Sequence, residues 1–341
     1  MSFADKVIVI TGASDGIGAE LARQLAPEKP KLVLAARRLG ALQLVAGQCE
    51  AAGAEAIAVR CDVGVEADCM ALAASAVARF GRIDMLVNNA GVSGQARLED
   101  VSDFRWYEDM MRVNFMGSVW CTRYALAELR KTKGLVAGIA SLAGKVGVPE
   151  RTAYSPSKFA QAGFFEALRT ELAGTGVDVT VVFPGVVATN IRYHGYGADG
   201  KVAGRSGLKE EGAMSVEECA RQIITALRGR KRERVMTGQG QGRPVAEVVR
   251  AAAGRQHGPC GSEKARLAVD DHDQTLNTQV GAIAAHFLHC DTCRPTAVHG
   301  SAPFRAATEG RDRPPGSEGG AVVRLPVQPR SGIGPTTLQD T

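Results

Sequence analysis

The feature that most constrains the fold is an alternation of short apolar runs with longer amphipathic segments over the first 240 residues. In the segment 16–26, for example, Ile17, Leu21 and Leu25 fall on one helical face. Apolar strands separated by helices are typical of a parallel sheet covered on both sides. The pattern predicts an α/β domain with a doubly wound, seven-stranded parallel sheet (the Rossmann fold), whose ligands bind beyond the carboxyl ends of the strands. The runs, rich in valine and isoleucine, are 6–11, 31–36, 56–61, 84–89, 134–141, 177–183 and 233–238.

The composition changes near residue 240. Nine of the 14 prolines and five of the six histidines lie in 240–341, whereas all five tyrosines and both tryptophans precede it. Aromatic side chains anchor cores, and only 280–289 in this stretch has a helical pattern. We therefore predict a single domain over 1–239 and a disordered tail over 240–341. Two hypotheses for the tail stay open: a reading-frame shift in the gene, or a genuine linker or recruitment segment.

The charge pattern gives no indication of nucleic-acid binding. The net charge is +5, and the basic run 228–234 lacks interleaved aromatic residues, so we interpret it as solvated cations at a helix end. No stretch approaches the roughly 18 apolar residues that span a bilayer. A strand-like run begins a few residues after Met1, which leaves no room for a signal peptide. We expect a cytoplasmic protein without a transmembrane segment.

The eight cysteines do not form a metal-binding pattern. His286, His289, Cys290 and Cys293 resemble half of a zinc site, but a second pair at finger spacing is missing, so we expect no metal. The cysteines of the first 240 residues are scattered singly, as reduced thiols in a core usually are; they are Cys49, Cys61, Cys69, Cys121 and Cys219.

A glycine-rich turn, TGASDGIG (11–18), follows the first predicted strand and opens the first helix. Gly12 permits a tight turn, and Gly18 lets the helix pack close to the sheet. The helix N-terminus offers free N–H groups and a positive dipole end to a pyrophosphate. The position of the turn, between a first strand and a first helix, predicts a dinucleotide site. We expect cofactor contacts from Gly12, Ser14, Asp15, Gly16, Ile17 and Gly18.

The end of the second predicted strand indicates which dinucleotide binds. Ala36 stands where an acidic residue would hold the ribose 2′-hydroxyl, and Arg37 and Arg38 follow it. A carboxylate there would repel a 2′-phosphate, whereas an arginine would bind it. The alternative is two solvated cations at a helix start, which the helix dipole disfavours. We therefore predict NADP(H), with Arg37 and Arg38 as cofactor-binding residues.

Tyr154 and Lys158 stand four residues apart in the helical pattern of 152–173, so they lie on one face. Together with the glycine turn and the sequence NNAG (88–91), in this order, they make the chain resemble a short-chain dehydrogenase/reductase over residues 3–239. Within that family the stretch 141–172 is similar to NADP(H)-dependent members of the branch that contains 11β-hydroxysteroid dehydrogenase-like enzymes. This resemblance implies an oxidoreductase that moves hydride between NADP(H) and a carbonyl or alcohol.

The resemblance also implies the site residues. In it, Tyr154 exchanges a proton with the substrate oxygen, and Lys158 lowers the pKa of Tyr154 and holds the nicotinamide ribose. Ser141, 13 residues before Tyr154, binds the substrate oxygen, and Asn114 holds a water that passes protons to Lys158. The expected catalytic residues are thus Asn114, Ser141, Tyr154 and Lys158. The last two are also expected to contact the cofactor, with Asp62, Val63, Asn89, Ala90, Gly91, Pro184, Gly185, Val187 and Thr189.

Two positions depart from the family pattern. Pro156 stands between Tyr154 and Lys158, where a first helical turn tolerates it, and Ala140 replaces a serine that is often seen there. The glycine-rich stretch 190–214, with Tyr193, His194 and Tyr196, predicts a mobile lid. The resemblance suggests a moderately apolar ketone, aldehyde or alcohol, steroid- or lipid-like, as substrate.

The family also predicts a homodimer or homotetramer formed through the helices 107–131 and 152–173. Two other functions stay open: a nucleotide-binding regulator without turnover, and a protein inactivated by the altered C-terminus. Retention of Ser141, Tyr154 and Lys158 argues against the regulator, because a binding module needs no tuned phenol.

Overall fold

The computed structural model describes residues 1–204 and 212–236. These two ranges belong to one compact unit of the chain. The predictions made for 240–341, including the helix at 280–289 and the group from His286 to Cys293, lie outside the described residues.

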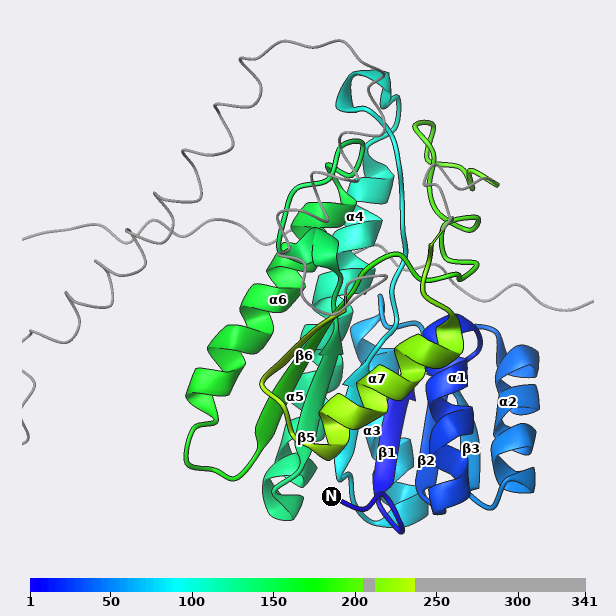
Figure 1. Cartoon of the computed structure of the whole chain (residues 1–341), viewed down its shortest axis with the longest axis vertical. Coiled ribbons are helices and arrows are strands. Elements are labelled where there is room, and N and C mark those ends of the chain that lie inside the picture. The colour runs from blue at the N-terminus through cyan, green and yellow to red at the C-terminus, as the bar shows by residue number, and fades with distance from the viewer. Residues whose placement is uncertain (205–211, 237–341) are drawn as a thin grey trace, which may run out of the picture. The chain divides into compact units, whose positions relative to one another are not determined.

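The core of the described unit is a seven-stranded parallel sheet with strand order β3-β2-β1-β4-β5-β6-β7 (Figure 1). The predicted seven-stranded sheet is confirmed, and the strand boundaries differ from the predicted ones by at most two residues. The order reverses between β1 and β4, so the crevice at this switch point is where a doubly wound sheet binds its ligand. The strands are β1 (Val7–Thr11), β2 (Lys31–Ala36), β3 (Glu55–Arg60), β4 (Met85–Asn88), β5 (Leu135–Ile139), β6 (Asp178–Pro184) and β7 (Glu233–Met236).

Helices cover both faces of the sheet, as the apolar strands predict. Ile8 and Ile10 of β1 pack with α1, α2 and α7 in one hydrophobic cluster, whereas Val7 and Val9 pack with α3, α5 and α6 in a second cluster. Alternate side chains of a strand point to opposite faces, so each central strand joins two cores. The helices are α1 (Gly16–Leu25), α2 (Leu39–Ala51), α3 (Glu66–Phe80), α4 (Arg105–Met111), α5 (Gly117–Thr132), α6 (Tyr154–Glu171) and α7 (Val216–Arg228).

The helix predicted over 107–131 is interrupted. The chain passes from α4 into a π-helical segment, Arg112–Met116, and then into α5. A π-helical turn fits one additional residue into a helix and often marks a functional position. The interruption falls on Asn114, whose side chain contacts a loop and a helix on either side of it.

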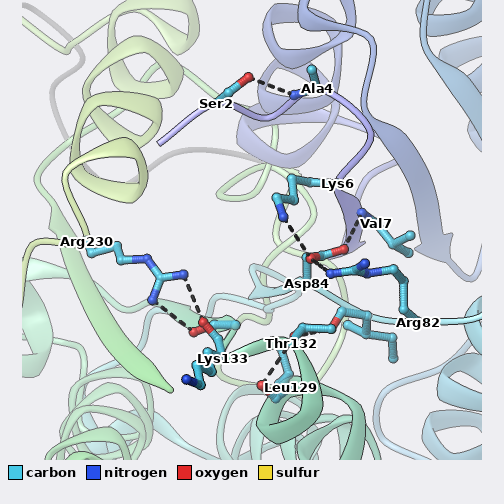
Figure 2. Close-up of polar contacts among 12 residues, drawn as sticks. Ser2, Ala4, Lys6, Val7, Arg82, Asp84, Leu129, Thr132, Lys133 and Arg230 are labelled. Atoms are coloured by element: carbon cyan, nitrogen blue, oxygen red, sulfur yellow. Dashed lines mark hydrogen bonds and ion pairs between the residues drawn. The ribbon is translucent and has the colours of Figure 1, made fainter. Parts of the chain in front are cut away.

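A buried carboxylate fixes the edge of the sheet that lies opposite the carboxyl ends of the strands (Figure 2). Asp84, directly before β4, is 6% exposed. It accepts hydrogen bonds from the backbone N–H of Val7 at 3.0 Å, from Nζ of Lys6 at 3.3 Å and from the guanidinium of Arg82 at 2.6 Å. Because these groups belong to the beginnings of β1 and β4, Asp84 holds the two central strands in register.

The basic run 228–234 makes contacts within the same unit. The guanidinium of Arg228 pairs with Glu28, that of Arg230 with Asp178 at 2.6 Å, and that of Arg232 with Glu166 at 2.7 Å. The five cysteines in the described part of the chain are buried free thiols, as predicted. Among the described helices, none has the length and apolar character needed to cross a membrane.

Candidate functional site

The glycine turn packs directly against the end of β4. Gly12 has φ of +67°, and a Cβ at this position would lie 2.8 Å from the Cα of Ala90. The side-chain amide of Asn89 donates hydrogen bonds to the carbonyl oxygens of Thr11 at 2.9 Å and of Gly12 at 3.2 Å. A Cβ on Gly18 would collide with this amide and with the carbonyl of Gly12. Only glycine satisfies both positions, because the turn, the first helix and the β4 end converge there.

A buried hydroxyl joins the two strands at the switch point. Oγ1 of Thr11, the last residue of β1, accepts hydrogen bonds from the backbone N–H groups of Asn89 and Ala90, each at 3.0 Å. The same hydroxyl donates to the carbonyl of Val87 at 3.3 Å. The backbone after β4 is therefore fixed beside the glycine turn.

A cavity of about 1160 Å³ opens at the carboxyl ends of the strands. It is lined by nineteen of the twenty-one predicted site residues, whereas Gly18 and Asn114 do not line it. The lining residues from the prediction are Gly12, Ser14, Asp15, Gly16, Ile17, Arg37, Arg38, Asp62, Val63, Asn89, Ala90, Gly91, Ser141, Tyr154, Lys158, Pro184, Gly185, Val187 and Thr189.

Two exposed arginines lie at the β2 end of the cavity. β2 ends at the buried Ala36, and Arg37 and Arg38 follow it. The guanidinium of Arg38 lies 3.6 Å from the carboxylate of Asp15, which also caps α1 by accepting from the N–H of Gly16 at 2.7 Å. On the neighbouring strand end, the carboxylate of Asp62 accepts from the N–H of Gly64 at 2.9 Å.

Ser141 and Tyr154 meet at the other end of the cavity. Ser141 follows β5 and begins a short 3₁₀ turn, Leu142–Gly144, where its hydroxyl accepts from the N–H of Ala143 at 3.2 Å. Tyr154 is the first residue of α6. Pro156 is therefore the third residue of that helix, where its missing N–H costs no helical hydrogen bond.

The electrostatic surroundings of Tyr154 differ from the expected ones. Burial raises the pKa of the Tyr154 phenol above its usual value, and this effect outweighs a hydrogen bond with Ser141 and the positive charges of Arg151 and Arg192, which lower the pKa. The guanidinium carbon of Arg151 lies 5.7 Å from the centre of the Tyr154 ring. The positive charges that lower this pKa in the structure are those of Arg151 and Arg192.

Lys158 is directed into the protein. Its side chain is 3% exposed, and Nζ donates to the carbonyl oxygen of Ile139 at 3.1 Å and to Oε1 of Gln161 at 3.0 Å. Burial lowers the pKa of Lys158 to about 7. The amine can therefore gain or lose a proton near neutral pH.

The side chain of Asn114 holds two segments together. Its Oδ1 accepts from the N–H of Val92 at 2.8 Å, and its Nδ2 donates to the carbonyl of Val92 at 3.0 Å and to the hydroxyl of Ser157 at 2.9 Å. Both N–H donors of the amide are thus used within the protein. A Cβ on Gly91 would lie 3.1 Å from Oδ1 of Asn114 and 3.6 Å from Nζ of Lys158.

The stretch after β6 reaches the loop that follows β4. The N–H of Tyr196 donates to the carbonyl of Ser93, and the N–H of Gln95 donates to the carbonyl of Tyr196, both at 2.9 Å. The Tyr196 ring stacks on Trp106, with 5.9 Å between the ring centres. Of the predicted lid, residues 205–211 lie outside the described part.

Four residues of the site were not predicted from the sequence: Ser157, Gln161, Arg151 and Arg192. The first two hold Asn114 and Lys158, and the two arginines line the cavity beside Tyr154. The signal for Gln161 was its position one turn after Lys158 in the same helix. A single sequence carries no signal that separates a buried arginine from an exposed one.

A comparison with known proteins agrees with this geometry. The model of the short chain dehydrogenase family matches residues 6–195. The chain is 44% identical to "11-beta-hydroxysteroid dehydrogenase-like 4A" of Arabidopsis thaliana over 183 residues, which are 53% of this chain and 61% of that protein. It is 37% identical to "11-beta-hydroxysteroid dehydrogenase A" of Sesamum indicum over 235 residues, 67% of each chain. This chain thus spans about three fifths of the length of the Arabidopsis relative.

A solved structure shares the fold. The alcohol dehydrogenase of the archaeon Thermococcus sibiricus, complexed with 5-hydroxy-NADP, superposes with a TM-score of 0.60 at 27% identity, covering 70% of this chain and 99% of that one. The family match covers the glycine turn, β1 to β6 and both Tyr154 and Lys158. On these grounds, the chain belongs to the short chain dehydrogenase family.

Proposed function

We propose that the protein is an oxidoreductase that transfers hydride between NADP(H) and the carbonyl or alcohol group of a moderately apolar small molecule. The observation that carries the proposal is the convergence of Ser141, Tyr154 and Lys158 on one end of a cavity whose other end is the glycine turn. A phenol, a hydroxyl and an amine at one wall suit proton exchange with a substrate oxygen.

The residues present fit a dinucleotide. Gly12 and Gly18 leave the space that a Cβ would fill, and α1 directs free N–H groups toward the cavity. The glycine turn would hold the pyrophosphate, Asp62 and Val63 the adenine, Asn89 to Gly91 the adenosine ribose side, and Pro184 to Thr189 the nicotinamide. When bound, the dinucleotide supplies or accepts the hydride.

The chain's own residues handle the proton. In reduction, Tyr154 donates its phenolic proton to the carbonyl oxygen of the substrate, and in oxidation the phenolate takes the proton from the alcohol. Ser141 donates a hydrogen bond to the same oxygen, where negative charge develops in the transition state. Lys158, which also lines the cavity, would hold the nicotinamide ribose. For Asn114 we propose a positioning role, because its side chain holds the loop after β4 against α6.

Preference for NADP(H) follows from charge at the end of β2. Ala36 offers no carboxylate to a ribose hydroxyl, and Arg37 and Arg38 are exposed at the cavity wall. A guanidinium binds a phosphate through charge-assisted hydrogen bonds. The solved relative complexed with 5-hydroxy-NADP supports the same choice.

An apolar substrate follows from the wall near Tyr154. This wall carries aliphatic side chains from the loops after β4, β5 and β6, and such a lining favours an apolar body with one reactive oxygen. The relatives that are named 11-beta-hydroxysteroid dehydrogenases support a steroid- or lipid-like ketone, aldehyde or alcohol. The aliphatic lining residues are Val92, Leu142, Val146, Val148, Pro149 and Ile191.

The test is turnover of NADPH with a panel of apolar ketones and aldehydes, followed by the absorbance of the reduced nicotinamide. We expect turnover with NADPH, weaker turnover with NADH, and a loss of at least about 100-fold in Tyr154→Phe. The matched control is Tyr107→Phe: the hydroxyl of Tyr107 binds Thr152 at 2.7 Å, but Tyr107 does not line the cavity. Its activity should stay near that of the natural protein.

Binding measurements separate the alternatives. NADPH binding without turnover on any substrate would favour a nucleotide-binding regulator. A folded protein that does not bind NADPH would contradict the proposed cofactor site and favour an inactive protein.

A further inference from the structure

We propose that Arg151 is a positioning residue for this reaction, whose buried guanidinium stabilises the phenolate form of Tyr154. Its meaning for catalysis rests on the proposed function, but the electrostatic relation between the two side chains can be measured without turnover. No part of the sequence pattern singled out Arg151, which lies three residues before Tyr154 in the turn that leads into α6.

Arg151 is a buried cation whose partners are all neutral. It is 4% exposed. One terminal nitrogen donates to the hydroxyl of Ser93 at 2.8 Å and to the carbonyl of Gly94 at 3.0 Å, and the other donates to Oε1 of Gln95 at 3.2 Å. Within residues 1–204 and 212–236, no carboxylate forms an ion pair with it. A charge buried in this way costs free energy unless an opposite charge compensates it.

Glu150, the acidic residue next to Arg151 in the sequence, forms its hydrogen bond and its ion pair with other residues. The carboxylate of Glu150 accepts from the side-chain amide of Gln95 and lies 3.9 Å from the guanidinium of Arg97. Burial and the charge of Arg192 lower the pKa of Arg151, whereas the charges of Tyr154 and Glu150 raise it. An arginine starts from a value above about 12, so the group stays charged in the neutral range.

The guanidinium faces the ring of Tyr154. Its central carbon lies 5.7 Å from the ring centre, within the range of a cation–π contact. Loss of the phenolic proton would place a full negative charge on this ring system and strengthen the attraction. The phenolate would therefore place a negative charge beside Arg151, which forms no ion pair within the described residues.

The other charged groups around Tyr154 do not replace Arg151. Lys158 of the same helix donates to Ile139 and Gln161. Arg192, from the stretch after β6, also lowers the pKa of Tyr154, but less than Arg151 does. In the part of the chain that the structure describes, the remaining titratable side chains here are His194 at the cavity wall, and Tyr107 and Tyr196 in the hydrophobic cluster that includes Tyr154. None of these three is a cation paired with the phenol.

The test is a spectrophotometric titration of the phenol in the cofactor-free protein. The absorbance of tyrosinate is followed with pH, and the curve of the matching Tyr154→Phe variant is subtracted, which isolates Tyr154. We expect Arg151→Gln to raise the midpoint by at least about one pH unit. The control is Lys145→Gln, which removes a cation that lies 4.3 Å from the ring centre of Phe183. This control should leave the Tyr154 midpoint unchanged.

A second measurement, the pH dependence of kcat/KM, links the effect of Arg151 on Tyr154 to turnover. In alcohol oxidation the phenolate is the active form, so the acidic limb of kcat/KM should move to higher pH in Arg151→Gln by the same amount as the titration midpoint. A lower rate with an unmoved limb and an unmoved titration midpoint would mean that Arg151 only holds the loop, and would overturn the inference. A protein without turnover contradicts the proposed function, while the titration still decides the role of Arg151.

A second neutral variant guards against a folding defect. Arg151→Met keeps an unbranched stem and removes the buried charge, a replacement that buried ion sites often tolerate. Folding is checked by circular dichroism, and the variant that folds is titrated. A midpoint equal to that of the natural protein in either folded variant overturns the inference.

Discussion

The amine of Lys158 donates a hydrogen bond to Oε1 of Gln161 at 3.0 Å, one turn further along α6. The amide of Gln161 then donates to the hydroxyl of Ser118 on α5 at 2.8 Å, and this hydroxyl donates to the carbonyl of Asn114 at 3.3 Å. A buried chain of hydrogen bonds therefore connects Lys158 with the π-helical segment. It is a direct route between the two residues for which a water-mediated link was expected.

Replacing Gln161 should show how much these hydrogen bonds contribute to the stability of the protein. Gln161→Met removes an acceptor from Lys158 and a donor from Ser118, so that two buried polar groups each lose one hydrogen bond. We expect a loss of about 2 kcal/mol in the free energy of unfolding, measured by urea denaturation. Gln48→Met, at an exposed glutamine on α2 that accepts from Arg23, should change it by less than about 0.5 kcal/mol. Equal losses in the two variants would contradict a special role for Gln161.

The buried amine should make stability depend on pH. The pKa of Lys158 falls from 10.5 to about 7 on folding, so the cost of burying its charge is fully present below pH 7. Above this pH the folded state loses the proton first, and stability should rise with pH toward about 10.5, by at most about 1.4 kcal/mol per unit. Lys158→Met removes this contribution. Urea denaturation of both proteins at a series of pH values should show their difference in stability changing in this direction, and a constant difference would exclude the shift.

Two arginines should control cofactor choice. Arg37→Gln combined with Arg38→Gln removes both cations at the end of β2. We expect the Kd for NADPH to rise about 10- to 100-fold, while the Kd for NADH changes by less than about threefold. Fluorescence titration measures both. Arg105→Gln, an arginine paired with Asp103 outside the cavity, serves as the control; a parallel loss of NADH affinity would point to damage of the whole site.

The glycine turn should not tolerate a side chain. In Gly12→Ala the Cβ meets Ala90 at 2.8 Å and the φ of +67° becomes strained. We expect a loss of at least about 1 to 3 kcal/mol in the free energy of unfolding, measured by thermal and urea denaturation. Gly47→Ala on α2, where nothing lies within 4 Å, should instead stabilise the protein by about 0.5 to 1 kcal/mol. A tolerated Gly12→Ala would show that the turn is not tightly packed.

The carboxylate of Asp84, at the edge of the sheet opposite the cavity, should contribute to the free energy of unfolding but not to cofactor binding. Asp84→Asn weakens the contacts with Lys6, Val7 and Arg82 and should lower the free energy of unfolding by about 1 to 3 kcal/mol. Asp178→Asn is the control, because its exposed pair with Arg230 is expected to contribute less than about 1 kcal/mol. Cofactor affinity in both variants should equal that of the natural protein.

The strands were predicted well from the sequence because both faces of each central strand are buried, as the five buried residues of β1 illustrate. The glycine turn could also be predicted from the sequence, because its local backbone conformation requires glycine. The π-helical segment could not be predicted, because it contains neither proline nor glycine. Contacts of Asn114 with Val92 and Ser157, distant in the sequence, determine it.

The direction of the charged side chains was the weakest part of the prediction. Lys158 turns toward a backbone carbonyl and a glutamine, and Arg151 turns inward against Tyr154. Such orientations depend on which loop closes over the helix start, and helical periodicity carries no information about that. The division of the chain near residue 240 stays a prediction.

The π-helical segment also has a consequence for insertions and deletions. One residue advances an α-helix by about 100°. The π-helical turn at Arg112–Met116 absorbs one additional residue, whereas a residue inserted into the regular first turn of α5 would rotate the rest of that helix by this angle relative to α4. The face of α5 that now buries Cys121, Ala125 and Leu129 against the sheet would then point sideways. A chain lengthened by one residue without a second π-helical turn could therefore keep either the position of α4 or the packing of α5, but it could not keep both.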